Sequence, residues 1–401
     1  MKMSNMQKID WYMGPVMCWI VNLFFRKNKS NIVAKSDDLN FEKFLIIKFW
    51  GMGSILILSD AVKLLRENFP SARIDFLTLD RNKDVATSLK LFDKVFVVNV
   101  SNLLVKFFVE VFKLVYFLRK ERYDVLVDFE FFTRFSALIS LFINARITAG
   151  FHSWEVYRGN FHNVVVPFNR YWKAKKNFIN LVSSLVEKKE LKDRVRIVVD
   201  EGTKRYIDEL FQSYNVSKKY VCLNINTGEL ALERRWPQEY WVELVKLILQ
   251  EYKDFDIVFV GNENESRYID IVLNKITVGS FKEEYVRLKN FAGKFNFLQL
   301  SEVLLRGKLF ITADSGPLHL ADMLAVPTIS FFGPETPVLY GPESKNHFVF
   351  FKNIDCSPCI NVHAGKLVKC VKKYPECMKS ITVKEVWEKV REFLGISWSN
   401  E

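Results

Sequence analysis

The sequence predicts an α/β protein made of two doubly wound units, and three observations lead to this fold class. Short apolar segments alternate with amphipathic helical segments, which gives a parallel sheet with right-handed crossovers. This alternation lapses once near the middle of the chain and then restarts. The chain has 401 residues, more than one hydrophobic core usually supports. We therefore expect an N-terminal extension over residues 1–43 and two Rossmann-like domains, over residues 44–195 and 196–401.

The first domain is predicted from its strand segments. Residues 44–49 form an apolar run with one lysine that ends at Gly51-Met52-Gly53, which is typical of a buried parallel strand followed by a tight turn. Apolar residues then recur at helical spacing until Phe69-Pro70. Strands are expected at Phe44–Phe49, Arg73–Leu79, Lys94–Val100, Val125–Val127 and Ile147–Gly150, and helices at Ile55–Asn68 and Leu103–Lys120.

The pattern lapses over residues 151–190, which are rich in aromatic and basic residues, and residues 194–200 are expected to be a short edge strand or a linker. The alternation of the second domain then begins. Strands are expected at Tyr220–Asn226, Asp256–Val260, Leu309–Thr312 and Thr328–Phe332, and helices at Gln238–Tyr252, Asn264–Ile276, Leu298–Arg306, Pro317–Leu324 and Val383–Phe393.

The N-terminal extension contains an apolar, aromatic-rich stretch from Trp11 to Phe25, followed by Arg26, Lys27 and Lys29. The stretch is too short to span a bilayer, and no small-residue cleavage site of a secretory signal follows it. Two interpretations stay open: a helix in the membrane interface, or a helix packed on the domain surface.

The net charge of +12 favours anionic partners, which include nucleic acid, anionic lipid and phosphorylated substrates. No homeodomain, zinc-finger or RNP-type motif is present, so we expect no nucleic-acid partner.

The strongest local motif is the segment from Ile311 to Leu320. A strand ends at Thr312, a turn follows, and Pro317 lies at a position that suits the first turn of a helix. Such a helix start, with its free backbone N–H groups, binds phosphate well. The alternative is a capped helix with a packed histidine.

Four of the six cysteines lie within 22 residues and form the pattern C-x2-C-x10-C-x6-C. Cys356, Cys359, Cys370 and Cys377 supply the four soft ligands that a structural zinc site needs. Free thiols or redox pairs are the alternative. Cys18 and Cys222 stand alone and are expected to be buried apolar side chains.

Longer segments resemble glycosyltransferase family 9, the ADP-heptose–lipopolysaccharide heptosyltransferases. The segment DSGPLHLADMLAVPTISFFGPETPVLYGP, residues 314–342, resembles the family's C-terminal signature, and residues 44–78 resemble its opening strand, glycine turn and helix. Residues 123–128, 150–151 and 235–237 fall where the family has similar segments. The similarity runs from about Phe44 to Pro342.

The resemblance implies a GT-B fold, two Rossmann-like domains that face a central cleft, and an inverting transfer from a nucleotide sugar such as ADP-heptose. The acceptor would be a lipopolysaccharide core or another anionic glycolipid. The enzyme would need no cofactor for catalysis, and it would be cytoplasmic with a possible peripheral contact at the inner membrane.

The resemblance also implies roles for individual residues. The C-terminal domain would bind the nucleotide sugar through Arg234, Glu265, Phe295, Asp314, Ser315, Gly316 and His319. Arg234 would face a phosphate, and Glu265 and Phe295 would contact the nucleoside. The N-terminal domain would bind the acceptor through Gly53, Arg134, Lys173 and Lys176.

The glycine turn departs from the family pattern, because the family's candidate base is an aspartate and this chain has Ser54. We expect Glu130, two residues beyond Asp128, to take the acceptor proton. Several alternatives stay open. Glu130 is a solvated carboxylate or a partner of Arg134, Asp128-Phe-Glu130 is a D-x-D-like metal site, or the chain is an inactive nucleotide-sugar or glycan binding protein.

Overall fold

The computed structural model describes residues 3–25, 41–100, 104–153, 155–188, 190–228, 231–277, 283–360 and 369–395. The described chain divides at Val195 into two compact units, each with its own parallel six-stranded sheet. The cations Arg26, Lys27 and Lys29 lie outside the described residues.

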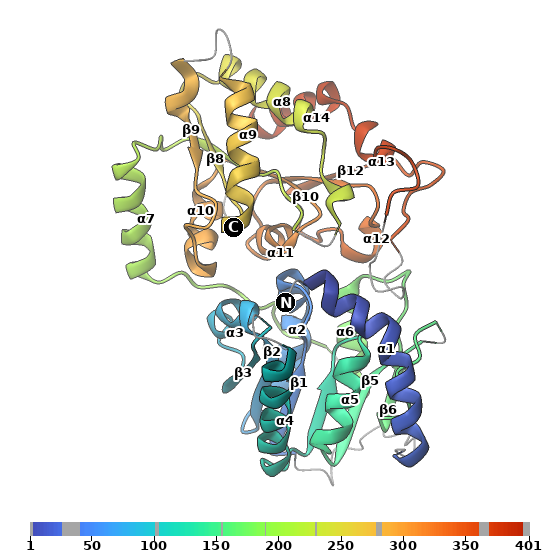
Figure 1. Ribbon diagram of the computed structural model, residues 1–401. Helices are drawn as coiled ribbons and strands as arrows, with labels where there is room; N and C mark the ends of the chain where they lie inside the picture. The colour runs from blue at the N-terminus through green and yellow to red at the C-terminus, as the bar shows by residue number, and fades with distance from the viewer. Residues whose placement is uncertain are drawn as a thin grey trace. The chain divides into compact units, whose positions relative to one another are not determined.

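The sheet of the first unit has the strand order β3-β2-β1-β4-β5-β6 (Figure 1). Its strands are β1 (Lys43–Ile47), β2 (Arg73–Leu79), β3 (Lys94–Val98), β4 (Val125–Asp128), β5 (Ile147–His152) and β6 (Val164–Pro167). Its helices are α1 (Met3–Phe24), α2 (Met52–Asn68), α3 (Lys83–Ser88), α4 (Leu104–Lys120), α5 (Arg134–Ile143) and α6 (Ala174–Ser183). Helices α4, α5 and α1 pack in one row, and α2 packs against α6 and α3.

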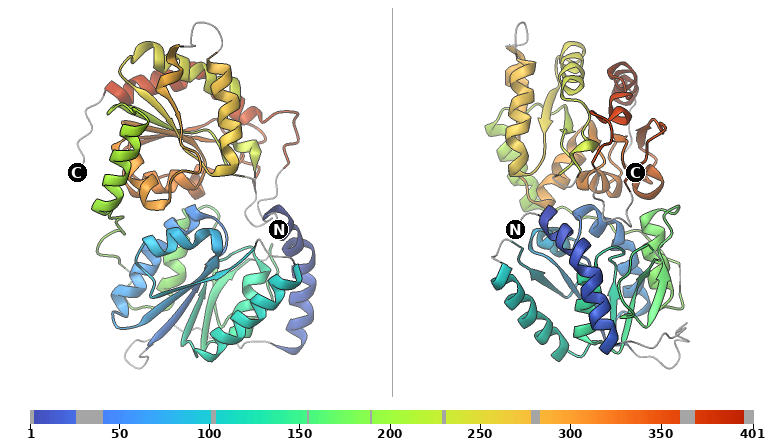
Figure 2. Two further views of the ribbon diagram at one scale, coloured as in Figure 1. Left: turned by 60° about the vertical axis from the view of Figure 1, so that its left-hand side comes forward. Right: turned by 45° about the vertical axis from the view of Figure 1, so that its right-hand side comes forward.

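The sheet of the second unit has the strand order β12-β11-β10-β7-β8-β9 (Figure 2). Its strands are β7 (Tyr220–Asn224), β8 (Asp256–Phe259), β9 (Leu288–Asn290), β10 (Leu309–Ala313), β11 (Thr328–Phe332) and β12 (His347–Phe351). Its helices are α7 (Glu201–Ser213), α8 (Gln238–Glu251), α9 (Ser266–Ile276), α10 (Phe297–Arg306), α11 (Gly316–Met323), α12 (Pro337–Tyr340), α13 (Glu376–Lys379) and α14 (Val383–Gly395).

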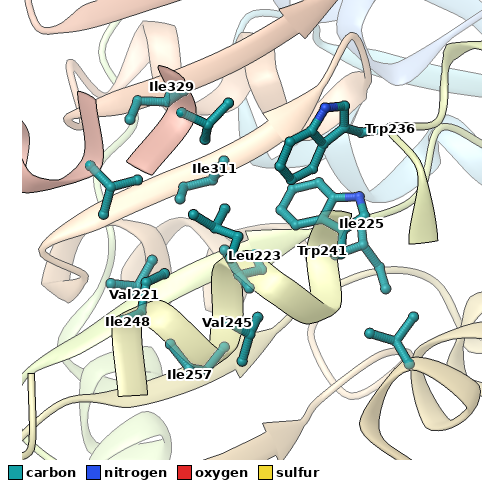
Figure 3. Packing of buried hydrophobic residues seen from close by; sticks show 14 of the residues in the cluster. Val221, Leu223, Ile225, Trp236, Trp241, Val245, Ile248, Ile257, Ile311 and Ile329 are labelled. Atoms are coloured by element: carbon teal, nitrogen blue, oxygen red, sulfur yellow. The ribbon is translucent and has the colours of Figure 1, made fainter. Parts of the chain in front are cut away.

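The core of the second unit lies between its sheet and the row of α9, α8 and α14. Figure 3 shows β-branched side chains of the central strands, among them Val221, Ile257 and Ile311, packed beside Trp236 and Trp241. Strands buried on both faces are expected to be continuously apolar, which is the pattern of β7, β8 and β10.

Both sheets have the same topology. Counted along each unit, the strand order is 3-2-1-4-5-6 in both, so the crossovers change direction between β1 and β4 and between β7 and β10. Ligands of doubly wound sheets bind beyond the carboxyl ends of the strands at this switch point. The register places Asp128 beside Ile47 and Asn224 beside Thr312, so the loops after each central pair start side by side.

The predicted central elements agree with the structure within a few residues. Several elements were not predicted, and residues 194–200 form no strand. The missed elements are the edge strands β6, β9 and β12 and the helices α3, α5, α6, α7, α12 and α13. The N-terminal helix is longer than expected, since it starts at Met3. None of the helices in the described ranges combines the length and the apolar character that crossing a bilayer requires.

Candidate functional site

The start of α11 lies at the switch point of the second sheet. Ser315 is its extended N-cap residue and Pro317 lies in the first turn. The Ser315 hydroxyl is not used as a cap. It accepts a hydrogen bond from the Asn224 amide at 3.0 Å and lies 3.1 Å from the Thr312 hydroxyl. The first N–H groups of a helix have no intrahelical acceptor, so this end presents donors and a positive dipole to an anion.

Arg234 is held at this helix start by two loops. Its guanidinium donates to the Asp314 carboxylate at 2.9 Å, to the Asp314 carbonyl at 3.0 Å and to the Thr227 carbonyl at 2.8 Å. The pair neutralises Asp314, which would otherwise repel a phosphate. Asp314 is therefore placed to orient Arg234, and its expected place at or beside the diphosphate stays a prediction.

Asn226 was missed by the sequence analysis. It follows β7, its side chain is fully buried, and neither its amide oxygen nor its amide nitrogen has a hydrogen-bond partner. A buried amide without partners is unfavourable, which marks a position where a ligand or water completes the site. The signal in the sequence was a pair of asparagines, Asn224 at the end of the apolar strand and Asn226 just beyond it.

The other predicted nucleotide-site residues lie in the loops or turns beyond the same edge of the sheet. Glu265, after β8, accepts hydrogen bonds from the backbone of Asn262 at 2.9 Å and of Gly228 at 3.2 Å, so its carboxylate joins two loops. Phe295, after β9, is half-buried with its ring 5.3 Å from that of Phe291. His319 is half-buried on the first turns of α11, 6.3 Å from the Tyr340 ring.

In the first unit, Glu130 and Lys48 form a buried ion pair at the switch point. Their charged groups are 3.0 Å apart, and the side chains are at most 1% exposed. The same carboxylate accepts the backbone N–H groups of Phe49 at 2.7 Å and Trp50 at 2.9 Å. Glu130 therefore fixes the start of the glycine turn, where Gly51 has a φ of 82° that favours glycine.

This environment corrects two expectations for Glu130. Glu130 is not solvated, because it is fully buried, and its ion-pair partner is Lys48 and not Arg134. Strand β4 ends at Asp128, so Glu130 lies in the loop beyond the strand. A fully buried, ion-paired carboxylate is poorly placed to take a proton from an acceptor hydroxyl.

Asp128 is held by a separate network. It contacts Arg158, the Ser136 hydroxyl at 2.9 Å and His162 at 3.4 Å. Burial alone would raise the pKa of Asp128, but the facing Arg158 and His162 lower it below its ordinary value. Asp128 and Glu130 thus each face a cation. Within the described ranges, no three His, Cys, Asp or Glu side chains gather in a possible metal site, and this holds for the cysteine segment as well.

The predicted acceptor residues differ in how far their side chains are exposed. Arg134 is buried beneath α1, where it lies 4.9 Å from the Trp11 ring and bonds to the Tyr157 carbonyl, so it anchors that helix and does not present its charge to an acceptor. Gly53 is buried in the first turn of α2, and Ser54 beside it is half-exposed. Lys173 and Lys176 lie at the start of α6, with Lys176 exposed over the Trp172 ring at 4.1 Å.

A second residue that the sequence analysis overlooked is the carboxylate Asp80, directly after β2. Its Oδ1 atom is buried without a hydrogen-bond partner, and the residue is half-exposed. The neighbouring Asn82 donates to the Phe49 carbonyl at 2.8 Å, and Thr78 donates to the Lys48 carbonyl at 2.6 Å. Asp80 therefore lies at the same edge of the sheet as the glycine turn, although no local motif marked it.

All six cysteines are free thiols. As expected, Cys18 and Cys222 are buried in the cores of their units. Cys359 and Cys377 pack near the loop after β11, since the Cys359 N–H bonds to the Pro334 carbonyl at 2.9 Å and Cys377 lies beside Gly333. Burial raises the pKa of Cys377 to about 11, and burial with the nearby Cys370 and Cys356 raises that of Cys359. Zinc at these thiols stays a prediction.

Comparison with known proteins connects this geometry to a family. The model of glycosyltransferase family 9 (heptosyltransferase) matches residues 111–370, more than half of the chain. Lipooligosaccharide heptosyltransferase 2 of Campylobacter jejuni is 26% identical over 43% of this chain and 50% of its own length, so the match spans only half of that relative.

Two further relatives are matched over nearly their whole length. Lipopolysaccharide heptosyltransferase 1 of Campylobacter coli is 23% identical over 88% of this chain and 99% of its own. The structure of the ADP-heptose lipopolysaccharide heptosyltransferase II of Escherichia coli has a TM-score of 0.69 at 19% identity, over 88% of this chain and 98% of that one. This likeness confirms the predicted GT-B class of α/β fold. The chain belongs to glycosyltransferase family 9, a family of glycosyltransferase enzymes.

Proposed function

We propose that this protein transfers a heptose from ADP-heptose to the core of a lipopolysaccharide or a similar anionic glycolipid, with inversion at the sugar carbon. The observation that carries the proposal is the site at the switch point of the second sheet, where Arg234 is bonded to Asp314 at the start of α11 and the neighbouring loop after β7 carries the unpartnered amide of Asn226. The names of the family 9 relatives supply the sugar and the acceptor class.

The second unit would hold the donor. The diphosphate would lie at the N-terminus of α11, with donors from Arg234 and the Asn226 amide. Sugar transfer passes through an oxocarbenium-like state while negative charge grows on the departing diphosphate. Donors that are already fixed in place stabilise that charge without reorganisation, which favours the reaction at this end of the sheet. Glu265 and Phe295 are the proposed contacts of the nucleoside.

The first unit would bind the acceptor and receive its proton. Ser54 is not a base near neutral pH, and Glu130 is committed to Lys48 and the glycine turn. We therefore propose Asp80 as the base, because its carboxylate has an unpartnered oxygen and follows the strand next to β1. The acceptor oxygen would bond to the sugar carbon, the bond from that carbon to the diphosphate would break, and the proton would pass to Asp80. Lys173 and Lys176 are the proposed contacts of an anionic acceptor.

Turnover with purified components tests the proposal. The protein is incubated with ADP-heptose and a lipopolysaccharide core that lacks this heptose, and ADP and the enlarged glycan are measured together. We expect both products in equal amounts. Thermal shifts with ADP-heptose and with other nucleotide sugars give the donor preference, because a ligand of the native state raises its melting temperature. A donor-induced shift without transfer to any glycan would favour the binding-protein alternative.

A further inference from the structure

Helices α1 and α4 leave two long rows of apolar side chains uncovered. On α1 the exposed residues include Tyr12 at 72%, Trp19 at 58% and Phe24 at 76% exposure. On α4 they include Phe112 at 75% and Tyr116 at 55%. We call these exposed rows of α1 and α4 the outer face. More than half of the large apolar side chains exposed in the described chain lie on these helices, on α5 or directly after α1.

The two rows belong to one layer of the first unit. Helix α5 packs against α1 on one side and against α4 on the other, so the three helices lie side by side over one face of the sheet (Figures 1 and 2). Phe142, near the end of α5, is exposed as well. Such a concentration of exposed large apolar side chains on one unit marks an interaction surface.

The opposite side of α1 shows that the helix is docked firmly. Asp10 accepts the backbone N–H groups of Phe135 at 2.8 Å and Arg134 at 3.1 Å and so caps α5. Asn22 accepts the Asn160 N–H at 2.9 Å, and Cys18 is fully buried against Ala137 and Phe161. The exposed row is therefore the outward side of a helix whose inward side is packed and hydrogen-bonded to the first unit.

The charges of the outer face select one kind of partner. Lys8 and Asp10 are the charged residues of α1, and Asp10 is turned inward to cap α5. Helix α4 carries Lys106, Lys113, Arg119 and Lys120 as exposed cations against the single acid Glu110. Lys120 lies 4.4 Å from the Tyr116 ring. Aromatic residues with lysines beside them suit the boundary of an anionic bilayer, where apolar rings enter the interface and cations meet the headgroups.

We propose that the outer face of α1 and α4 lies flat on the surface of an anionic phospholipid bilayer. Two helices far apart in the sequence would enter the interface together, and neither would cross it. The inference rests on the proposed function only in that a lipid-borne acceptor is reached at such a surface.

Vesicle binding by the full chain tests the inference. Flotation is measured with vesicles of phosphatidylcholine and of phosphatidylcholine mixed with phosphatidylglycerol. We expect binding to the anionic vesicles that weakens with salt. Trp19→Ser on α1 and Phe112→Ser on α4 are each expected to lower the partition coefficient about tenfold, and Lys113→Gln about fivefold. Tyr285→Ser and Lys218→Gln, exposed in the second unit, serve as matched controls with unchanged binding.

The outcomes separate the alternatives. Equal partition to both kinds of vesicle, or wild-type partition by Trp19→Ser and Phe112→Ser with unchanged melting temperatures, overturns the inference. Sedimentation equilibrium without lipid detects a second copy of the chain, and a dimer that these variants dissociate while vesicle binding persists would also overturn it. Turnover on a water-soluble acceptor glycan is measured in parallel. Its absence with intact vesicle binding counts against the proposed function and leaves the surface standing.

Discussion

At the scale of single residues, Asn226 gives the sharpest prediction. We expect Asn226→Ala to lower the affinity for ADP about tenfold, because the lost hydrogen bonds would be to a charged ligand. The melting temperature without ligand should not fall, since the amide has no partner in the protein. Calorimetric titration and the ADP-induced thermal shift measure the two effects.

Asn177 offers a matched control for Asn226. It is also fully buried, but its amide bonds to Asn169 and Lys173 in the first unit. Asn177→Ala should lower the melting temperature and leave the ADP affinity unchanged. Unaltered ADP affinity in Asn226→Ala would remove Asn226 from the donor site.

Substitution of two carboxylates in the first unit should affect different properties: turnover for Asp80 and stability for Glu130. Asp80→Asn is expected to lower turnover by about 100-fold or more with the melting temperature retained, as loss of a general base would. Glu130→Gln is expected to destabilise the protein by about 3–5 kcal/mol, because Lys48 is left buried without its partner. Thermal unfolding and turnover are measured on both variants.

Ser54→Asp in the Asp80→Asn background provides a rescue, since it restores the acid that the family resemblance places in the glycine turn. Recovery of part of the activity would support a shared reaction centre. Wild-type turnover by Asp80→Asn would instead rule out Asp80 as the base.

Asp128 links the stability of the first unit to pH. The pKa of Asp128 is lowered in the folded state by Arg158 and His162, after burial is offset. Its contribution to stability is therefore complete above about pH 4, near the unfolded pKa, and is lost as the pH falls through the lower folded pKa. The difference in melting temperature between the wild type and Asp128→Asn should therefore stay constant down to about pH 5 and shrink as the pH falls below about pH 4. Glu388→Gln, at an exposed position of α14, is the control, and a constant difference for Asp128→Asn would contradict the linkage.

At the scale of elements, the cysteine segment lies beside the loop after β11. We predict about one zinc per chain, bound by Cys356, Cys359, Cys370 and Cys377. Cys359→Ser should abolish zinc in elemental analysis of the purified protein, and Cys222→Ala, a single buried thiol on β7, should retain it. Thiol titration that finds these four groups free in a zinc-free, fully stable protein would favour plain cysteines.

The sequence predicts elements well where burial is complete. Strands β7, β10 and β11 are covered on both faces, so their apolar runs gave their positions closely. The edge strands β6, β9 and β12 keep partly exposed side chains, β9 has only three residues, and β6 ends in a proline, so no continuous apolar run separates them from loops. Helix α7 was overlooked because its exposed side is strongly charged and it buries only Ile207 and Phe211.

The sites followed the same division. The start of α11 was predictable because its Gly-Pro turn and its helical pattern are local in sequence. The pairing of Lys48 with Glu130 joins residues 82 positions apart, and it depends on the register of β1 against β4. No local pattern specifies such a partner, which is why the pairing with Lys48 was not among the expectations for Glu130.

At the scale of the whole molecule, the positive charge replaces a metal in the proposed chemistry. In the proposed function, Arg234 and the N-terminus of α11 would supply the donors that face the diphosphate. We predict that transfer persists in EDTA and does not increase with Mg²⁺ or Mn²⁺. Turnover that vanishes in EDTA and returns with either ion would place a divalent cation at the diphosphate. Zinc content is measured in the same samples, because a strong chelator also removes zinc from the cysteines.

The division of the described chain at Val195 has a consequence for folding during synthesis on the ribosome. All six strands of the first sheet precede that residue, and no strand of the second sheet is needed to complete it. Domains generally fold as units during synthesis, the N-terminal one first. The first sheet can therefore close while residues of the second are still being added, and its buried charges Lys48 and Glu130 meet before the second unit is complete.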